Sequence, residues 1–405
     1  MSFTPRRDSR GYGNSRPSFG GSRSFGGRPQ QRQMGPRPQY IHPSRYVNRA
    51  VEREAVVETA ITNSFADFNL QPQLTQNIIS HGYTIPTPIQ DQAIPLVLAG
   101  RDVVGIANTG TGKTAAFLIP ILNKIALNPQ EGALIVVPTR ELAVQVKDEC
   151  FAFARGMNIG VALCVGGMNI ATQMQNLRRN PHVVIGTPGR LKDLIERRAL
   201  DTSMFTNIVL DEVDRMLDIG FRKDIQYLIS LLPNPRHSLC FSATVTNEVQ
   251  EIMRSFLHDP AQVSVKVTET NEHIDQDIVR IVPGQNKIEV LYDLLIQQEF
   301  ERVMVFGRTK HGINKLEEIL TSRGLRVTSI HGNKSQGARQ RSLDDFKRGR
   351  VRALLATDVA ARGLDINDVS HVINFDEPNS YEDYVHRIGR TGRAGKVGKA
   401  LTFVV

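Results

Sequence analysis

Short apolar runs separated by helix-forming stretches are the feature that most constrains the fold of this 405-residue chain. The runs form two series along the sequence. They are DVVGIA (102–107), ALIVVP (133–138), HVVIGT (182–187), NIVLDE (207–212) and SLCFSA (238–243), then RVMVFG (302–307), RVTSIH (326–331), RALLAT (352–357), HVINFD (371–376) and KALTFVV (399–405). Apolar strands that alternate with helices are typical of parallel sheets covered by helices on both faces. We therefore predict two α/β domains in tandem.

A polar segment, HDPAQVSVKVTETNEHIDQD (258–277), separates the two series and is rich in Thr and Asp. It predicts a linker between two independently packed domains. We place the first domain at residues 64–264, the linker at 265–278 and the second domain at 279–405. Residues 46–63 are expected to form a connecting segment with helical potential.

Residues 1–45 are dominated by Gly, Ser, Arg and Pro and cannot bury enough apolar surface to offset the entropy of ordering. We predict a disordered tail. Residues 1–49 contain ten Arg and a single acid, Asp8, so this segment accounts for the whole net charge of +9. Arginines interleaved with aromatic residues favour loose binding to nucleic-acid backbones and bases. The alternative interpretation is a tail that only solubilises the protein.

Other features limit the class of protein. No apolar run approaches the ~18 residues that a membrane span requires, and the Arg- and Gly-rich N-terminus does not resemble a secretory signal. The three cysteines are far apart in the sequence, which predicts buried thiols in a reducing cytoplasm rather than a zinc site or disulfides. The sequence lacks coiled-coil heptads, so we expect a cytoplasmic monomer that does not contact membranes.

The segment NTGTGKT (108–114) follows an apolar run and precedes the helical stretch AAFLIPILNKIA (115–126). A Gly-rich loop in this position predicts a phosphate-binding P-loop, in which backbone N–H groups and a helix N-terminus surround the phosphates. We expect Lys113 to reach the β- and γ-phosphates and Thr114 to bind magnesium. The general pattern begins with Gly, whereas this chain has Ala107.

Three acids, Asp211, Glu212 and Asp214, follow the apolar run Ile208–Leu210. Acids are favourable in the first turn of any helix, which is one interpretation. The other is that Asp211 holds magnesium through water and Glu212 polarises the attacking water. Because the P-loop and the acids both follow strands, and α/β nucleotide domains bind ligand at strand ends, we favour the second interpretation for the first two acids. The helix-start role suits Asp214.

With these residues in place, the chain resembles the DEAD-box RNA helicases of helicase superfamily 2, from about Phe65 onward. The acidic tetrad Asp211–Asp214 has Val213 where that family usually has Ala. The family's P-loop also has Ala at its first position. Further matches are GYTIPTPIQ (82–90), PTRELA (138–143), TPGR (187–190), SAT (242–244), ATDVAARGLD (356–365) and HRIGRTGR (386–393). The resemblance implies two tandem RecA-like domains in an ATP hydrolase, and the compact core suggests a bacterial member.

The resemblance also implies roles for individual residues at the nucleotide. Gln90 would read the edge of adenine, Phe65 would stack on the base, and Asp365 would reach the ribose. The implied catalytic residues are Lys113, Asp211, Glu212, Arg390 and Arg393, of which the two arginines would approach the γ-phosphate from the second domain. Further implied ATP-binding residues are Thr109, Gly110, Thr111, Gly112 and Thr114, with Thr114 and Asp211 as the magnesium residues.

Loops with Arg, Thr and Gly can donate hydrogen bonds to phosphates, and the resemblance implies that several of them contact RNA. The implied RNA-binding residues are Thr139, Arg140, Gly167, Thr187, Gly189 and Arg190 in the first domain, and Arg308, Thr309, Thr357 and Arg362 in the second. Ser242, Thr244, His386 and Arg387 would couple the two domains.

Three functional classes are considered. The first is an ATP-dependent RNA helicase, in which RNA stimulates closure of the two domains and short duplexes or RNA–protein complexes are remodelled. The second is an ATP-gated RNA clamp without significant unwinding, and the third is a superfamily 2 DNA translocase. We favour the helicase, with ATP and Mg²⁺ as cofactors and single-stranded or duplex RNA as partner. Ribosomal or RNA-decay proteins are the expected protein partners.

Overall fold

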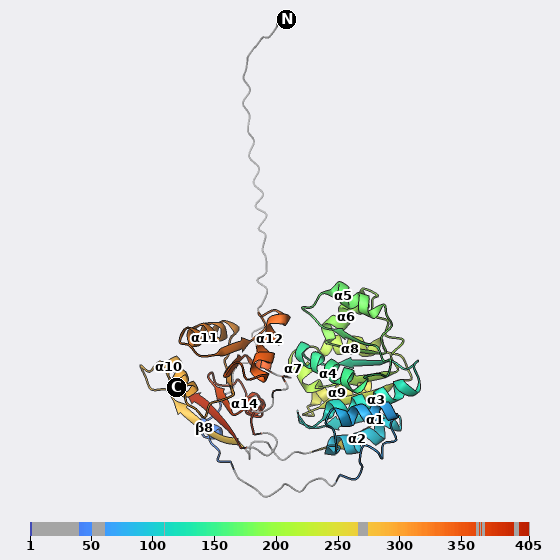
Figure 1. The fold of residues 1–405 in the computed structure, drawn as a ribbon, viewed down its shortest axis with the longest axis horizontal. Helices are drawn as coiled ribbons and strands as arrows, with labels where there is room; N and C mark the ends of the chain where they lie inside the picture. Colours follow the sequence, from blue (N-terminus) through green and yellow to red (C-terminus); the bar gives the residue numbers. More distant parts are fainter. Residues whose placement is uncertain are drawn as a thin grey trace, which may run out of the picture. The chain divides into compact units, whose positions relative to one another are not determined.

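The computed structural model describes residues 1, 40–50, 61–108, 110–265, 274–361, 364, 366, 369–392 and 397–404. Two parallel sheets organise this part of the chain (Figure 1). The first has seven strands in the order β3-β4-β2-β5-β6-β1-β7. Its strands are β1 (Val103–Ile106), β2 (Ala133–Val136), β3 (Val161–Cys164), β4 (Val183–Gly186), β5 (Asn207–Leu210), β6 (His237–Ser242) and β7 (Ala261–Ser264).

The second sheet has six strands in the order β10-β11-β9-β12-β13-β8, and all of its neighbouring strands also pair in parallel. Its strands are β8 (Ile274–Arg280), β9 (Val303–Phe306), β10 (Val327–Ile330), β11 (Ala353–Ala356), β12 (His371–Asn374) and β13 (Gly398–Val404). The predicted α/β class with two parallel sheets is therefore confirmed.

Successive residues of the first sheet's strands enter two different cores. Val209 of β5 packs into one core, and its neighbours Ile208 and Leu210 pack into the other. This alternation follows from the strand geometry, since adjacent side chains point to opposite faces. One core is covered by α1 (Pro72–Ser80), α2 (Pro88–Leu98), α3 (Lys113–Leu127) and α4 (Arg140–Phe153). The other is covered by α5 (Ile170–Leu177), α6 (Pro188–Glu196), α7 (Val213–Asp218), α8 (Arg222–Ser230) and α9 (Asn247–Phe256).

The second sheet follows the same plan. Val303 and Val305 of β9 face one core, and Met304 and Phe306 face the other. The first of these cores is covered by α10 (Lys287–Leu295) and α11 (Lys310–Ser322). The second is covered by α12 (Gln336–Lys347), α13 (Asp358–Ala361), α14 (Tyr381–Ile388) and a short 3-10 helix, η1 (Pro43–Tyr46). Residues 40–45, assigned to the tail from composition, thus include part of this core.

Three strands were not among the predicted apolar runs, namely β3, β7 and β8. Each of them lies at the edge of its sheet. Edge strands bury fewer side chains than central strands, as the half-exposed residues of β7 and β8 show. The sequences of β7 and of the first half of β8 are accordingly polar and lie within the segment that reads as a linker, whereas β3 is apolar in sequence and this reason does not apply to it.

Two further predictions from the sequence concern the cysteine thiols and membrane-spanning helices. Cys150, Cys164 and Cys240 are free and buried, as predicted. Burial raises the pKa of the Cys150 and Cys164 thiols to about 12, so these groups are poor nucleophiles. Within the described residues, the helices are all too short or too polar to cross a membrane.

Candidate nucleotide site and nucleic-acid interface

Most of the predicted functional loops follow the carboxyl ends of strands. In the first sheet, the P-loop, the acids and the SAT segment follow β1, β5 and β6, which are neighbours in the order β5-β6-β1. The Arg- and Gly-containing loops follow β2, β3 and β4, which are neighbours in the order β3-β4-β2. The carboxyl ends of these strands therefore carry the predicted nucleotide residues on β5, β6 and β1, and the predicted RNA residues on β3, β4 and β2.

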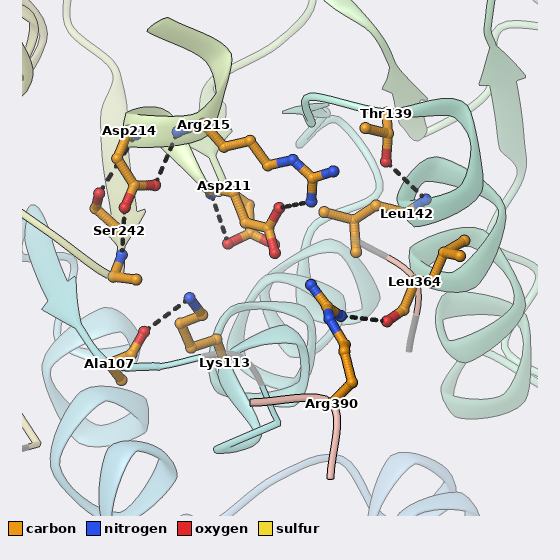
Figure 2. A network of polar contacts seen from close by, with 12 residues as sticks. Ala107, Lys113, Thr139, Leu142, Asp211, Asp214, Arg215, Ser242, Leu364 and Arg390 are labelled. Carbon is orange, nitrogen blue, oxygen red and sulfur yellow. Dashed lines mark hydrogen bonds and ion pairs between the residues drawn. The ribbon is translucent and has the colours of Figure 1, made fainter. Parts of the chain in front are cut away.

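The P-loop is shaped by two glycines in the left-handed region, Gly110 at φ +84° and Gly112 at φ +91°. A Cβ on Gly112 would lie 2.4 Å from Gln90 Nε2, so both the backbone angle and the space require glycine. Lys113 begins α3, is 6% exposed, and donates from Nζ to the Ala107 carbonyl at 2.8 Å (Figure 2). The lysine ammonium is thus held at the residue that precedes the P-loop.

The other P-loop residues lie around this turn. Thr111 Oγ1 donates to the Asn108 carbonyl at 2.8 Å, which closes the loop before α3. Thr114 is half-buried in the first turn of α3, next to Lys113. Thr109 lies outside the described residues.

Gln90 connects the P-loop to α2. Its Oε1 accepts from the Thr87 backbone N–H at 3.0 Å, and its Nε2 donates to the Gly112 carbonyl at 3.1 Å. A carboxamide has four hydrogen-bonding sites, so one N–H and one lone pair are left for a base edge. Phe65 is 3% exposed and packs edge-on against Phe68 and Tyr83, with ring centroids 5.9 and 6.3 Å away. In the ligand-free protein Phe65 is therefore a core residue.

The acids after β5 are buried in a strained turn. Asp211 is 2% exposed and its Oδ1 accepts from the Glu212 N–H at 2.9 Å. Burial raises the pKa of the Asp211 carboxyl to about 7, while the nearby Lys113 ammonium acts in the opposite direction. Glu212 has φ +52°, in the left-handed region, and such strain in a residue with a side chain is concentrated at functional sites. Arg215 Nη1 donates to Glu212 Oε2 at 2.9 Å, within a pair that is nearly buried (Figure 2).

Asp214 joins the acidic turn to the SAT segment. Its Oδ2 accepts from the backbone N–H of Ala243 at 3.2 Å, and from the N–H and hydroxyl of Thr244, both at 2.9 Å. Ser242 is fully buried, and its Oγ accepts from the Asp214 N–H at 3.4 Å and donates to the Thr244 carbonyl at 2.7 Å. Asp214 does lie in the first turn of α7, as predicted, but its carboxylate is used mainly to hold the loop after β6.

The predicted RNA residues of the first sheet lie around the Gly166–Gly167 turn. Gly167 has φ +77°, and a Cβ there would lie 2.2 Å from Arg140 Nη1, so the guanidinium lies directly over the turn. Arg190 approaches the same turn and donates from Nη1 to the Met168 carbonyl at 3.3 Å. Burial lowers the pKa of the Arg140 guanidinium, and the positive charge of Arg190 acts in the same direction.

Threonines and prolines fix where the helices of this region begin. Thr139 is the N-cap of α4 and accepts from the Leu142 N–H at 3.3 Å (Figure 2). Thr187 is the N-cap residue of α6, which begins with Pro188, and Gly189 is exposed in the first turn. The Thr139 hydroxyl thus caps a helix, whereas the Thr187 side chain makes no capping hydrogen bond, and contact with RNA stays a prediction for both.

In the second sheet, the predicted RNA residues again follow strands. Arg308 and Thr309 follow β9 and are exposed; the Arg308 N–H donates to Asp376 Oδ2 at 2.8 Å, and Thr309 is the N-cap of α11. Thr357 follows β11 and is half-buried. Arg362 and Asp365 lie outside the described residues.

Helix α14 carries the basic motif. Arg387 is 2% exposed and binds Asp358 through two hydrogen bonds, Nε to Oδ1 at 2.5 Å and Nη2 to Oδ2 at 2.8 Å. Its Nη1 donates to Asn374 Oδ1 and to the Asp376 carbonyl, so this guanidinium is bound within its own sheet unit. Arg390 follows the helix and donates to the Leu364 carbonyl at 2.6 Å (Figure 2).

Two roles implied for this motif stay predictions: coupling of the two domains by His386 and Arg387, and approach of Arg390 and Arg393 to the γ-phosphate as arginine fingers. His386 is exposed on α14, and Arg393 lies outside the described residues. Sequence reasoning missed three residues that shape the sites: Arg215, which binds Glu212, Asp358, which binds Arg387, and Asp214 in its bridging role. Only the regular 3-residue spacing from Glu212 to Arg215 on a predicted helix could have indicated the first of these.

Comparison with known proteins agrees with these features. The DEAD/DEAH box helicase family profile matches residues 87–252, and the helicase conserved C-terminal domain profile matches residues 286–395. The DEAD-box ATP-dependent RNA helicase CshA of Bacillus licheniformis is 45% identical over 85% of this chain and 71% of its own length. The RNA helicase CrhR of Synechocystis is 42% identical over 85% of this chain and 70% of its own length.

The chain covers 65% of the length of the CshA from Streptococcus pneumoniae, so these relatives are longer proteins. Among solved structures, S. cerevisiae Dbp5 bound to RNA and ADP BeF3 is similar with a TM-score of 0.74 and 32% identity, covering 85% of this chain and 90% of that chain. Two parallel sheets, a P-loop, the acidic tetrad and these matches lead to one assignment. This chain belongs to the DEAD-box family of ATP-dependent RNA helicases.

Proposed function

We propose that ATP is hydrolysed at the carboxyl edge of the first sheet, with Lys113, Asp211 and Glu212 as the residues that act on the phosphates and the attacking water. The observation that carries this proposal is the arrangement of the P-loop and the acids. The Lys113 ammonium lies near enough to the buried Asp211 carboxyl to oppose part of the rise in its pKa that burial causes, and Glu212 is held by Arg215 in the same turn. Phosphoryl transfer requires a cation at the phosphates, a carboxylate that holds the metal ion and a carboxylate that orients the attacking water.

The hydrogen bond from Lys113 to the Ala107 carbonyl is part of this proposal. A carbonyl is a neutral acceptor, whereas a phosphate oxygen is charged and forms a stronger bond with an ammonium. Lys113 is therefore expected to leave Ala107 when the β- and γ-phosphates enter. Thr109, Gly110, Thr111 and Gly112 would supply backbone N–H groups, and Gln90 with Phe65 would select adenine.

Magnesium fits the residues present. Mg²⁺ prefers few protein ligands and keeps waters and phosphate oxygens in its shell. The described residues contain no group of three or more His, Cys, Asp or Glu able to hold a metal ion, which fits an ion that arrives with the nucleotide. Thr114 and Asp211 are the residues proposed to hold it, and its chemistry would be to neutralise charge on the β- and γ-phosphates. Glu212 would orient the water.

RNA is proposed to bind the loops at the carboxyl ends of the strands in both sheets. In the first, Arg140 and Arg190 over the Gly167 turn offer two guanidinium groups to phosphates, together with Thr139, Thr187 and Gly189. In the second, Arg308, Thr309, Thr357 and Arg362 would continue the contact. The similarity to Dbp5, a protein solved with RNA and ADP BeF3, supports an RNA site and a nucleotide site on the same two sheets.

Closure of the two domains is proposed to link these sites. The domains divide between β7, which ends at Ser264, and β8, which begins at Ile274. Arg390 and Arg393 on the second domain would approach the γ-phosphate, and Asp365 the ribose, only when the domains close. An arginine finger contributes about 10³- to 10⁵-fold to the rate. Ser242 and Thr244, held by Asp214, and His386 with Arg387 would transmit closure between ATP and RNA.

The output is proposed to be local unwinding of short RNA duplexes, because a closed cleft that bends single-stranded RNA cannot accommodate a continuous A-form helix. The protein would act as a cytoplasmic monomer, and its three buried free thiols suit a reducing compartment. Ribosomal or RNA-decay proteins are the proposed protein partners.

The test is an unwinding assay with a 10-base-pair RNA duplex, a 30-base-pair RNA duplex and a 10-base-pair DNA duplex. Local unwinding predicts ATP-dependent strand release for the short RNA duplex alone, and none with Lys113→Ala. Long ATP-dependent residence on RNA without strand release would instead indicate an RNA clamp. Equal release of both long and short DNA or RNA duplexes would indicate a translocase.

A further inference from the structure

Residues 40–48 precede the first sheet in the sequence but pack on the second sheet. We call them the N-terminal clip. Asn48 pairs antiparallel with Gln276 of β8: the Asn48 N–H donates to the Gln276 carbonyl at 3.0 Å, and the Gln276 N–H donates to the Asn48 carbonyl at 2.7 Å. Because β8 is an edge strand, the clip caps an edge that would otherwise be open. Figure 1 shows this segment, in blue, beside β8.

The clip contributes side chains to the core of the second sheet. Tyr46 is fully buried and Ile41 is 6% exposed, in the same cluster as Ile274 and Tyr384. The rings of Tyr46 and Tyr384 have centroids 4.8 Å apart. The guanidinium carbon of Arg45 lies 3.7 Å from the centroid of the Tyr381 ring, a close cation–π contact.

Both tyrosines contacted by the clip belong to α14, an eight-residue helix. Tyr384 also donates from its hydroxyl to Gln276 Oε1 at 2.9 Å, so β8, the clip and α14 meet at this side chain. Helices of this length are marginal without tertiary packing. The clip therefore packs against the first turn of α14 through Tyr381 and Tyr384.

The other end of α14 carries the basic motif. Arg387 is one turn after Tyr384 and is fixed by Asp358. The Arg390 N–H donates to the Arg387 carbonyl at 3.2 Å, and the Arg390 side chain donates to the Leu364 carbonyl. A continuous set of contacts thus runs from Tyr46 through Tyr384 and the helix to Arg390.

We propose that the N-terminal clip positions the arginine finger: Tyr46, acting through Tyr384 and α14, fixes Arg390 for its approach to the γ-phosphate. This inference rests on the finger role given to Arg390 under the proposed function. Tyr46 is a positioning residue, since it touches neither ATP nor RNA.

A positioning role has a kinetic signature that a covering role lacks. All of the proposed ATP-binding residues except Asp365 belong to the first domain, so we expect loss of the clip to change the KM for ATP by no more than about twofold. A displaced finger lowers kcat instead, and small misplacements of a catalytic group cost up to about 100-fold. A segment that only covers apolar surface would lower the melting temperature and leave the kcat of the folded protein unchanged.

The experiment uses the full chain and measures RNA-stimulated ATP hydrolysis below the melting temperature of each variant. We expect Tyr46→Ala to lower kcat by about tenfold with a KM for ATP within about twofold of wild type. Tyr46→Phe is expected to restore wild-type kcat, since the Tyr46 hydroxyl has no hydrogen-bond partner among the described residues. Tyr40→Ala is the matched control, because Tyr40 lies in the same clip but is 84% exposed.

Arg45→Ala is the second variant, because Arg45 is exposed and its replacement leaves the core intact. We expect it to lower kcat by about threefold through loss of the contact with Tyr381. It decides the question if Tyr46→Ala does not fold. An unchanged kcat in Arg45→Ala and in folded Tyr46→Ala overturns the proposal, as does a change confined to KM.

Arg390→Ala separates this inference from the proposed function. If Arg390→Ala abolishes hydrolysis and the clip variants do not reduce kcat, only the positioning role falls. If Arg390→Ala keeps wild-type kcat, the finger assignment itself is wrong, whatever the clip variants do.

Discussion

Asp214 Oδ2 lies 2.9 Å from both the backbone nitrogen and the hydroxyl oxygen of Thr244 and accepts a hydrogen bond from each. The same oxygen accepts from the Ala243 N–H at 3.2 Å. One carboxylate at the start of α7 therefore fixes the loop that follows β6. The neighbouring Asp211 and Glu212 are the proposed catalytic acids, so these hydrogen bonds connect the loop after β6 to their turn.

Replacing Asp214 is expected to weaken this connection. Asp214→Ala removes the acceptor of the backbone N–H groups of Arg215, Ala243 and Thr244 and of the Thr244 hydroxyl, and we expect a loss of about 1–2 kcal/mol in the free energy of unfolding. RNA unwinding is expected to fall more than ATP hydrolysis, because the loop after β6 is the proposed coupling element. Chemical denaturation and paired unwinding and hydrolysis assays measure both effects. Asp293→Ala, an exposed carboxylate on α10, is the control, and an equal loss in both activities would contradict the coupling role.

Asp91 predicts an acid-sensitive contribution to stability. Its carboxylate accepts from the Thr62 N–H at 3.1 Å, and from the Asn63 N–H and side-chain amide at 2.9 and 2.8 Å. Burial raises the pKa of this carboxyl, but the three hydrogen bonds outweigh burial and the pKa lies below its ordinary value of 3.8. A depressed pKa means that the unfolded chain binds the proton more readily. The stabilisation is therefore complete above the unfolded value and is lost as the pH falls through the folded value.

The measurement is urea unfolding of wild type and Asp91→Asn between pH 3 and pH 6. We expect the variant to be less stable near neutral pH, with the difference shrinking below about pH 4. Asp293→Asn is the control for removal of an exposed carboxylate. A difference that is constant across this range would mean that the Asp91 charge does not contribute to folding.

Gly167 tests the proposed RNA surface of the first sheet. Gly167→Ala would place a Cβ 2.2 Å from Arg140 Nη1 and would displace the guanidinium. We expect the dissociation constant for single-stranded RNA to rise about tenfold, equivalent to about 1.4 kcal/mol, with basal ATP hydrolysis unchanged. Fluorescence anisotropy with a labelled RNA measures the affinity.

Gly156→Ala is a close control for this substitution. Gly156 has φ +78°, almost the same as Gly167, but the nearest atom to its Cβ is 3.9 Å away. Both substitutions place alanine in the left-handed region, which costs about 1 kcal/mol in each variant. Only Gly167→Ala also displaces Arg140. Equal RNA affinities in the two variants would remove Arg140 from the RNA site.

The tail tests whether auxiliary RNA affinity resides outside the two sheets. Residues 1–39 contain eight Arg and no Lys, and the clip begins after them. We expect deletion of residues 2–39 to weaken RNA binding and to flatten its salt dependence, because fewer phosphate contacts release fewer counterions. Basal ATP hydrolysis should not change. A chain of full length with these eight arginines replaced by Gln separates charge from length, and wild-type affinity in that variant would assign the tail a solubilising role.

The central strands and the loops after them were predictable because their residues satisfy two constraints together. Runs such as Ile208–Leu210 are buried on both faces and so must be continuously apolar, and the residues after them must be small or polar to reach ligand. Edge strands such as β8 escape the first constraint. Their side chains are half exposed, so their composition is that of a loop.

The contacts that sequence reasoning missed are long-range. Tyr46 and Tyr384 are separated by most of the chain, and only the fold brings their rings together. The short segment around Tyr46 shows neither helical nor strand periodicity, so its burial depends on contacts with β8 and α14 that the sequence does not reveal. Similarly, Phe65 is a core residue in the ligand-free protein, and its proposed stacking on adenine requires that ATP binding exposes the Phe65 ring.

The most direct test of the account is steady-state ATP hydrolysis with no nucleic acid, with single-stranded RNA, or with single-stranded DNA of the same sequence. Lys113→Ala is the blank for contaminating ATPase. Closure driven by RNA predicts strong stimulation by RNA, little by DNA, and no hydrolysis by the blank. Equal stimulation by RNA and DNA, or hydrolysis that is insensitive to RNA, would contradict the coupling of the two sheets through RNA.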